Sequence, residues 1–555
     1  MGVLVPYSRH VGIRADPADR TLIRGATLVD GTGAPPREAD VAIAGDTIAA
    51  VEPPGSLNSS GAELVDGRGH VVAPGLIDIM SHSLWPLMID GRSLSKVVQG
   101  VTTEVMGEGW TPAPFGGRVA EIEPPIPGIP EEWRARIRGW TRFGQWLEAV
   151  EEAGVSPNVA SFLGGGTVRE YACGLAMGVA QRDEREVMRR VTEQAMRDGS
   201  MGVAYALIYP PDAYAATDEI IEVARTAAAS GGMYICHMRS ESQRLLEAID
   251  ETIEIARASG ARSEIYHLKA SGGPANWHRM GPAVERIEAA REEGLPLTAD
   301  MYPYAASGTG LSARLPVSLA ADGRLLQRLV EPGVRDWVRA ELVRGTAEVD
   351  DPGPPDRTHP IGMRLAQHRQ YVGRNLAEIA AMRGQDWLDV VFDLLIAEGA
   401  EIFTVYHEMS EDNVRRQLQL PWVVVCSDAG GLDPAWAAAH GPVHPRDYGT
   451  FARVLGRYVR EERLLTLEDA IHRMSGEVAQ RLRIYDRGTV APGMAADVIV
   501  LDPDEVLDLA TFEDPHRLSV GVRDVWVNGV GTVRGGEHAG ALAGRFLRGP
   551  GYRGS

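Results

Sequence analysis

A regular alternation of apolar strand-like runs and helical patterns occupies residues 75 to about 430 of this 555-residue chain. Runs such as "MGVAYALIY" and "MYICHM" are strand-like, and "TDEIIEVARTAAASG" between them has a helical pattern. This rhythm is typical of repeated βα units around a parallel sheet. We count roughly eight such strands, which favours a (β/α)8 barrel over the alternative, a doubly wound open sheet. The chain has neither a G-x-G-x-x-G sequence after the first strand nor a Walker A sequence, so nothing indicates nucleotide binding.

The ends of the chain have a different pattern. Residues 21–72 and the last stretch, with "AADVIVLDP" and "VRDVWVNGV", are short alternating runs separated by Gly, Asn and Pro turns, which predicts β-structure at both ends. Residues 310–370 interrupt the βα rhythm. We interpret them as an insertion or lid over one end of the barrel; an ordinary long connection is the alternative.

Charge and composition exclude several classes of protein. The 56 basic and 76 acidic residues give a net charge of −20, which argues against nucleic acid and anionic membranes as partners. The opening residues lack the apolar core of a signal peptide, and we find no apolar run long enough to span a bilayer. With only 3 cysteines, a disulfide scaffold is excluded, and the cytoplasm is the expected location.

Polar residues follow several of the predicted strands, where a barrel carries its chemistry. His82 follows the first strand, His237 and His267 end two successive strands, and Asp428 follows the last one. Such a histidine is often only a hydrogen-bonding residue. Two imidazoles at the same point of neighbouring strands, with a carboxylate nearby, are also the pattern of a catalytic zinc site.

Several longer motifs occur in a fixed order: "VVAPGLIDIMSH", "QGVTTEVMGEG", "YICHMRSES", "YHLKASGG", "DMYPYAASGTG", "CSDAG" and "DRGTVAPGMAADVIVLDP". In these motifs the chain resembles the D-aminoacylase (N-acyl-D-amino-acid deacylase) branch of the amidohydrolase superfamily. The resemblance implies a (β/α)8 barrel with an insertion, and a small β-sandwich built from both chain ends. We therefore expect sandwich parts at 1–72 and 488–555 and a metallohydrolase barrel at 73–487, with the insertion at 310–370.

The resemblance also implies roles for individual residues. His237 and His267 fall on the two histidines that hold a tightly bound zinc ion in the family. Asp428 falls on the catalytic aspartate, which acts as general base and then as proton donor. The positions that hold the α-carboxylate of the substrate correspond to Lys269, Tyr302 and Arg446.

The chain departs from the family at one side of this site. Family members have His-x-His on the first strand, whereas here Met80 takes the first place and only His82 remains. Gly109 stands where the family has a cysteine ligand, and Glu108 precedes it. Gly164, Gly165 and Gly166 replace the family's Gly-His-Gly.

These departures surround the weaker, second metal position, so we expect one zinc ion per chain and a residual second-site role for His82. A thioether is a poor ligand for Zn²⁺, so Met80 is interpreted as apolar filling. We expect Glu108 to replace the missing cysteine as third ligand. The alternative is a site made of His237, His267 and Asp428, with Glu108 only a neighbour. Cys426 is expected in the core.

The sequence therefore predicts a zinc-dependent hydrolase of a linear amide, with an N-acyl-D-amino acid as the small-molecule substrate. A second hypothesis is an enzyme of the same fold acting on another amide, including ring closing or opening in a specialised metabolite. A third is a non-catalytic binding protein. The retention of His237, His267 and Asp428 together argues against the third.

Overall fold

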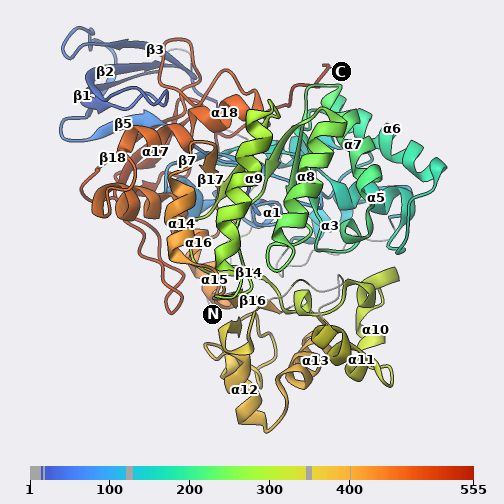
Figure 1. Ribbon diagram of the computed structural model, residues 1–555. Helices are drawn as coiled ribbons and strands as arrows, with labels where there is room; N and C mark the ends of the chain where they lie inside the picture. Colours follow the sequence, from blue (N-terminus) through green and yellow to red (C-terminus); the bar gives the residue numbers. More distant parts are fainter. Residues whose placement is uncertain are drawn as a thin grey trace.

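The computed structural model describes residues 14–16, 19–119, 129–344, 350, 353–400 and 402–554. Within these residues, the middle of the chain forms a ring of parallel strands (Figure 1). The strands, in ring order, are β6 (Leu76–Asp78), β7 (Val101–Met106), β8 (Asn158–Ser161), β9 (Leu163–Gly164), β10 (Gly202–Ala206), β11 (Met233–His237), β12 (Arg262–Ile265), β13 (Leu297–Met301) and β17 (Val423–Val425).

The ring closes at both of its seams, which excludes the open sheet. Strands β6 to β8 pair in parallel, and so do β9 to β17. Only Phe162 separates β8 from β9, so these two form one bent strand. A parallel bridge between Ser81 and Ala429 joins the first strand to the last. The predicted barrel is therefore confirmed, with eight strand positions when β8 and β9 are counted as one.

Helices cover the outside of the barrel because each carries an apolar stripe between charged faces. The main ones are α6 (Arg182–Asp198), α7 (Thr217–Ala228), α8 (Leu245–Ser259) and α9 (Met280–Glu292). Helix α6 begins with a capping box between Gln181 and Glu184 and ends at Gly199, whose φ of 106° suits a glycine C-cap.

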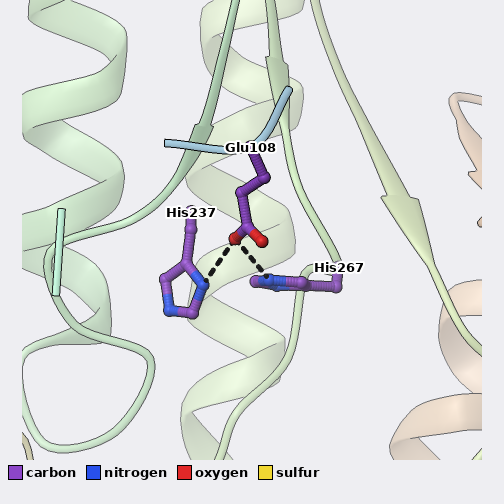
Figure 2. Close-up of side chains that lie close together, drawn as sticks. All are labelled: Glu108, His237 and His267. Carbon is purple, nitrogen blue, oxygen red and sulfur yellow. Dashed lines mark hydrogen bonds and ion pairs between the residues drawn. The ribbon is translucent and has the colours of Figure 1, made fainter. Parts of the chain in front are cut away.

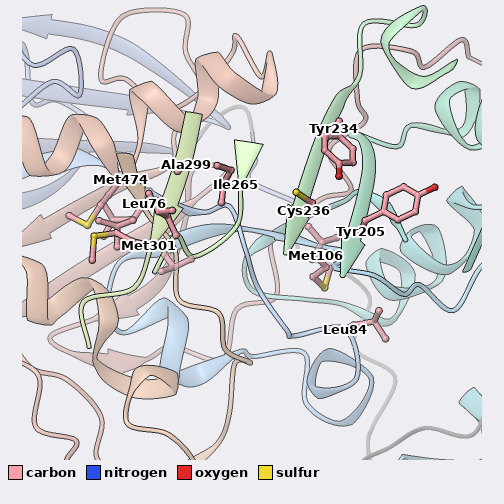
Figure 3. Close-up of a cluster of buried hydrophobic side chains, with 14 of the residues drawn as sticks. Leu76, Leu84, Met106, Tyr205, Tyr234, Cys236, Ile265, Ala299, Met301 and Met474 are labelled. Carbon is pink, nitrogen blue, oxygen red and sulfur yellow. The ribbon is translucent and has the colours of Figure 1, made fainter. Parts of the chain in front are cut away.

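Two buried clusters show how the strands alternate. On β11, Tyr234 and Cys236 belong to the larger cluster, which packs the strands against the helices (Figure 3). Met233 and Ile235 belong to the cluster that fills the barrel interior. Successive side chains of a strand point to opposite faces, so β11 contributes to both layers.

Both ends of the chain contribute to one nine-stranded sheet. Its main path runs β21-β20-β19-β18-β5-β1-β2-β3, and β4 pairs with β1. The strands are β1 (Arg20–Leu28), β2 (Arg37–Ala44), β3 (Thr47–Glu52), β4 (Glu63–Asp66), β5 (Val71–Pro74), β18 (Val498–Leu501), β19 (Val522–Val527), β20 (Val530–Arg534) and β21 (Glu537–His538). The expected union of the two ends in one β-structure is present; its further division into a sandwich stays a prediction.

A separate segment interrupts the barrel between β13 and β17. Its strands β14 (Ser307–Gly310), β15 (Thr358–Pro360) and β16 (Phe403–Tyr406) form an antiparallel sheet. Its helices α10 (Leu325–Leu329), α11 (Val334–Arg344), α12 (Leu376–Arg383) and α13 (Trp387–Glu398) project below the barrel in Figure 1 and share a core of their own. We call residues 307–406 the insertion. The predicted range of 310–370 lies inside it, and the described segment continues to Tyr406.

Among the described residues, no helix is both long enough and apolar enough to cross a membrane.

Candidate active site

The three predicted ligands lie close together at the carboxyl ends of their strands (Figure 2). Glu108 follows β7, His237 ends β11 and His267 follows β12. Oε1 of Glu108 lies 3.1 Å from Nδ1 of His237 and 3.6 Å from Nε2 of His267. One ligand atom from each residue lies within 4.8 Å of the other two, which is the spacing of a metal site.

A second group shares Glu108 with the first. Nε2 of His82 lies 3.2 Å from Oε2 of Glu108 and 2.8 Å from Oδ1 of Asp428. These three residues also offer ligand atoms within 4.8 Å of one another. Asp428 thus belongs with His82 rather than with the pair His237 and His267, so the geometry favours Glu108 as their common partner.

The local backbone explains why Glu108 and not its neighbour reaches the histidines. Gly107 and Gly109 have φ angles of 110° and 62°, which favour glycine. A Cβ on Gly109 would lie 2.7 Å from Cβ of Ala206, so no side chain fits there unless Ala206 moves. The side chain of Glu108, between these two glycines, is the one that reaches the histidines.

Two of the site residues have left-handed backbones. His267 has a φ of 33° and Asp428 one of 51°, in a region that non-glycine residues seldom adopt. The amide of Asp428 donates to the carbonyl of Met80 over 3.0 Å, which ties the last strand to the first. Such strain tends to concentrate at functional sites, where the surrounding structure enforces it.

The buried charges hold one another in their ionised forms. Burial alone would raise the pKa of Glu108, but hydrogen bonds from the three histidines hold it well below its ordinary range. Burial alone would lower the pKa of His82, but Asp428 and Glu108 outweigh it and raise the pKa to about 10. The pKa of Asp428 is depressed against the effect of burial, chiefly by Arg446. The carboxylates of the site therefore stabilise positive charge on the groups beside them.

The three predicted carboxylate-binding residues lie together beside Asp428. Nη1 of Arg446 is 2.6 Å from Oδ2 of Asp428, and the guanidinium stands 4.7 Å above the ring of Tyr302. Nζ of Lys269 lies 5.6 Å from the same ring. The hydroxyl of Tyr302 donates to the sulfur of Met409 over 3.7 Å. Arg446 thus already has a carboxylate partner within the protein.

Sequence reasoning missed Glu241. It stands four residues after His237 and its side chain is 7% exposed. Its carboxylate lies 3.0 Å from Nδ1 of His267, 3.4 Å from Nε2 of His237 and 2.7 Å from Nζ of Lys269. Burial alone would raise the pKa of Glu241, but His237, Lys269 and His267 lower it to about 2. The quoted motif "YICHMRSES" contained this residue, but only the loop geometry reveals its contacts.

The residues that depart from the family pattern are buried. Met80 is 1% exposed and, with Cys426, belongs to the cluster that fills the barrel. The predictions that Met80 is apolar filling and that Cys426 lies in the core are confirmed. Gly165 and Gly166 begin helix α5 (Gly165–Cys173), and a Cβ on Gly166 would lie 2.6 Å from the carbonyl of Gly109. These glycines therefore allow close backbone packing beside Glu108.

A cavity of about 1360 Å³ opens over the site. Its polar floor is formed by the charged residues just described. Its walls carry apolar side chains from the barrel loops and from the insertion, namely Leu84, Trp85, Trp110, Ile208, Leu315, Val317, Ile402, Phe403, Leu432 and Trp436. The arrangement suits a small molecule with both a polar and an apolar part.

Histidines and carboxylates gathered over the carboxyl ends of a closed parallel barrel are the arrangement of barrel metallohydrolases. A family model described as "Amidohydrolase family" matches residues 338–533. D-aminoacylase of Alcaligenes xylosoxydans xylosoxydans is 34% identical over 528 residues, covering 95% of this chain and 97% of the relative. N-acyl-D-aspartate deacylase of the same organism is 33% identical over 523 residues, covering 94% and 93%.

A solved structure agrees with these relatives. N-acyl-D-glutamate deacylase from Bordetella bronchiseptica, complexed with zinc and a phosphonate inhibitor, superposes with a TM-score of 0.77 at 30% identity, covering 97% of this chain and 100% of that one. The chain belongs to the D-aminoacylase family of amidohydrolases.

Proposed function

We propose that this protein is a zinc-dependent amidohydrolase that cleaves N-acyl-D-amino acids to a carboxylate and the free amino acid. The observation that carries the proposal is the convergence of Glu108, His237 and His267 on one point next to Asp428. The names of the relatives, D-aminoacylase and N-acyl-D-aspartate deacylase, support the substrate class.

The residues fit a zinc ion. Two imidazole nitrogens and one carboxylate oxygen are a common set for catalytic zinc, and the three side chains are at most 9% exposed. The neighbouring carboxylates that raise the pKa of His82 and His267, to about 10 and about 9, also favour a cation. When bound, such an ion polarises an amide carbonyl and lowers the pKa of water. We assign Glu108, His237 and His267 as its ligands.

We propose that one zinc ion binds tightly. The second group, His82 with Glu108 and Asp428, lacks the imidazole that Met80 replaces, and it must share Glu108 with the first group. Protein purified without added zinc should contain about one equivalent by mass spectrometry of the metal. Two equivalents would show that the second group binds just as firmly.

Asp428 is the proposed proton carrier. Its carboxylate stands between His82 and Arg446, at 2.8 Å and 2.6 Å, so both oxygens are held in place. An ionised carboxylate accepts a proton from the attacking water and then gives it to the departing amine. Asp428 has a left-handed backbone and lines the cavity.

The substrate carboxylate is assigned to Arg446, Lys269 and Tyr302. A guanidinium can bind a carboxylate through two parallel hydrogen bonds, and Lys269 adds a second positive charge. Because Arg446 also holds Asp428, the substrate carboxylate and the proton carrier would share one guanidinium.

The direct test is a panel of N-acetyl-D- and N-acetyl-L-amino acids, with release of free amine as the readout. We expect hydrolysis of the D-series only, and its loss after chelation with recovery on adding zinc. Equal activity on both series would contradict the proposed substrate class.

One observation favours the second function, hydrolysis of an amide that has no carboxylate. Arg446 is bound to Asp428 and therefore has less to offer a substrate anion. The two functions predict different relative rates of hydrolysis for N-acetyl-D-amino acids and for their C-terminal amides. Under the main proposal kcat/KM should be much lower for the C-terminal amides than for the acids, because Arg446 would then have no substrate carboxylate to bind. Faster turnover of the amides would favour the second function.

A further inference from the structure

Glu241 and Glu108 stand on opposite sides of the same two imidazoles. Each ring faces Glu108 with one nitrogen and Glu241 with the other: His237 through Nδ1 and Nε2, His267 through Nε2 and Nδ1. A histidine that ligates a metal must carry a proton on its remaining nitrogen, and that proton needs an acceptor. Glu241 lies 3.4 Å from Nε2 of His237, which has no hydrogen-bond partner among the described residues, and 3.0 Å from Nδ1 of His267, which Nζ of Lys269 also contacts at 2.7 Å.

Glu241 is itself fixed from outside the barrel. Its amide donates to Oδ2 of Asp350 over 2.8 Å, and the hydroxyls of Ser240 and Ser242 donate to Oδ1 of Asp350 over 2.5 Å each. Its carbonyl accepts from the amide of Ser271 over 2.8 Å. Asp350 belongs to the insertion, so the insertion is hydrogen-bonded to the loop that carries Glu241.

We propose that Glu241 is a positioning residue for the metal ligands and that Asp350 of the insertion holds it in place. Glu241 sets the tautomers of His237 and His267 so that both present a free nitrogen toward Glu108. It also gives Lys269 an acceptor, at 2.7 Å, and so keeps that ammonium beside the site. The inference rests on the proposed function only in taking the two histidines as zinc ligands.

The test measures zinc affinity by competition with a chromogenic chelator, without any substrate. Glu241→Gln keeps the size of the side chain but loses the charge and one acceptor oxygen. We expect zinc affinity to fall roughly 10- to 100-fold, the usual effect of removing such a partner. Glu241→Asp, which keeps the charge, should lose less. Asp350→Asn should weaken zinc in the same direction by a smaller factor.

The matched control is Glu251→Gln. Glu251 lies on α8, ten residues after Glu241, and its carboxylate pairs with Arg239 at 2.9 Å. This variant should bind zinc like the wild type. Unchanged zinc affinity in Glu241→Gln would overturn the role of Glu241, and unchanged affinity in Asp350→Asn would overturn that of the insertion. If the zinc affinities of the variants are as expected but the enzyme hydrolyses no N-acyl-D-amino acid, only the proposed function is contradicted.

A different observation bears on the acyl group of the substrate. The rings of Trp85 and Trp110 stack with centroids 5.4 Å apart and an interplanar angle of 24°, and both line the cavity. Trp85 follows His82 by three residues and Trp110 follows Glu108 by two, so the stack lies on the loops of β6 and β7.

The order of the strands places this stack across the barrel from the carboxylate anchors. In the eight-position ring, β7 lies opposite β12, which precedes Lys269, and β13 with Tyr302 is next to β12. A substrate whose carboxylate lies at Lys269 and Tyr302, with its amide over the centre, therefore directs its acyl group toward Trp85 and Trp110. We infer that the enzyme takes N-acyl-D-amino acids with a large apolar or aromatic acyl group; this deepens the proposed function.

The test compares N-phenylacetyl- and N-acetyl-D-methionine. We expect kcat/KM to be at least about 10-fold higher for the phenylacetyl substrate, and Trp110→Ala to remove most of that preference while changing the acetyl substrate little. Trp337→Ala is the control, because Trp337 is 37% exposed and does not line the cavity. A preference for acetyl, or an equal loss on both substrates, would overturn the inference.

A binding experiment keeps this inference separate from the proposed reaction. Phenylacetate, the acid that hydrolysis would release, should bind the wild type more tightly than acetate by calorimetry, and Trp110→Ala should abolish the difference. Equal binding of the two acids would overturn the acyl assignment even if amides are cleaved. If phenylacetate binds as expected but no amide is cleaved, only the proposed function is contradicted.

Discussion

Under the proposed function Asp428 carries the proton and is not a ligand of the tightly bound zinc ion. Its oxygens lie against His82 and Arg446, while Glu108 takes the place between the two histidines. Asp428→Asn should therefore fold and retain its zinc but lose on the order of 10²–10⁴-fold in kcat. Parallel assays of metal content and turnover check this. Loss of zinc together with activity would instead make Asp428 a ligand.

Glu408 gives a prediction that concerns stability alone. It lies in the cavity wall, accepts from the hydroxyl of Ser307 over 2.8 Å, and its other oxygen has no hydrogen-bond partner among the described residues. Burial raises the pKa of Glu408 to about 8. The folded protein thus keeps a proton that the unfolded chain releases near its ordinary pKa, so this contribution to stability is lost as the pH rises toward about 8.

Glu408→Gln should remove this loss of stability at higher pH. Relative to the wild type, the variant should gain roughly 2–3 kcal/mol in unfolding free energy between about pH 6 and about pH 9, following the size of the pKa shift. Urea unfolding at the two pH values measures the difference. A wild-type-minus-variant difference that does not change with pH would mean that Glu408 ionises normally.

Single residues differed in how far the sequence could predict them. His237 and His267 could be proposed because each ends a recognisable strand, where parallel strands bring their last residues together. Glu108 could be proposed from the resemblance, because it precedes the position of the family's cysteine ligand and its flanking glycines allow the backbone to shift. Glu241 could not, because it lies in an irregular loop, and its distance from His267 depends on how that loop folds back toward Ser271.

At the scale of elements, the end of β7 is decisive, because it determines which residue faces the histidines. Gly107 has a φ of 110°, and a Cβ there would lie 2.2 Å from the carbonyl of Phe162. Gly107→Ala should therefore push the end of β7 away from β8 and carry Glu108 with it. We expect weaker zinc binding and a lower melting temperature, with a cost of at least about 1–3 kcal/mol from the backbone strain.

Gly55→Ala is the control that separates the displacement of Glu108 from the effect of backbone strain alone. Gly55 has a φ of 81°, but a Cβ there meets nothing within 4 Å. This control should lower stability modestly and leave zinc affinity unchanged. If Gly107→Ala also keeps its zinc affinity, Glu108 is not held by the end of β7.

The βα rhythm predicted the barrel because long periodic helices and buried strands leave strong patterns. The insertion was harder to delimit. Its strands β15 and β16 are only three and four residues long, and they pair antiparallel within a sheet of their own, so they do not continue the rhythm. Its contact with the active site through Asp350 depends on one side chain in a loop, which has no periodic signal.

At the scale of the whole molecule, a buried polar network joins the terminal sheet to the barrel. Asp497, which precedes β18, forms an ion pair with Arg487 and accepts from the side chain of Asn158 on β8 over 2.9 Å. Asn528, in the turn after β19, donates its amide to Asp497 over 2.7 Å and its side chain to Asn158 over 2.7 Å. All four residues are at most 5% exposed.

The sequence could predict two β-rich ends but not this network, whose members lie up to 370 positions apart. Its consequence is that the sheet and the barrel should unfold together. Breaking a buried ion pair leaves one charge without a partner, which typically costs about 3–5 kcal/mol. Asp497→Asn keeps the shape of the side chain and leaves Arg487 in that position.

We therefore expect Asp497→Asn to lower the melting temperature while calorimetry still shows a single transition, because the remaining contacts keep the two parts coupled. Asp504→Asn is the control: Asp504 is exposed near the end of β18, and its replacement should change stability by no more than about 0.5 kcal/mol. Two separate transitions in Asp497→Asn would show that this network alone couples sheet and barrel. An unchanged melting temperature would show that the network contributes nothing to that coupling, and the terminal sheet would then be held by its apolar contacts with the barrel.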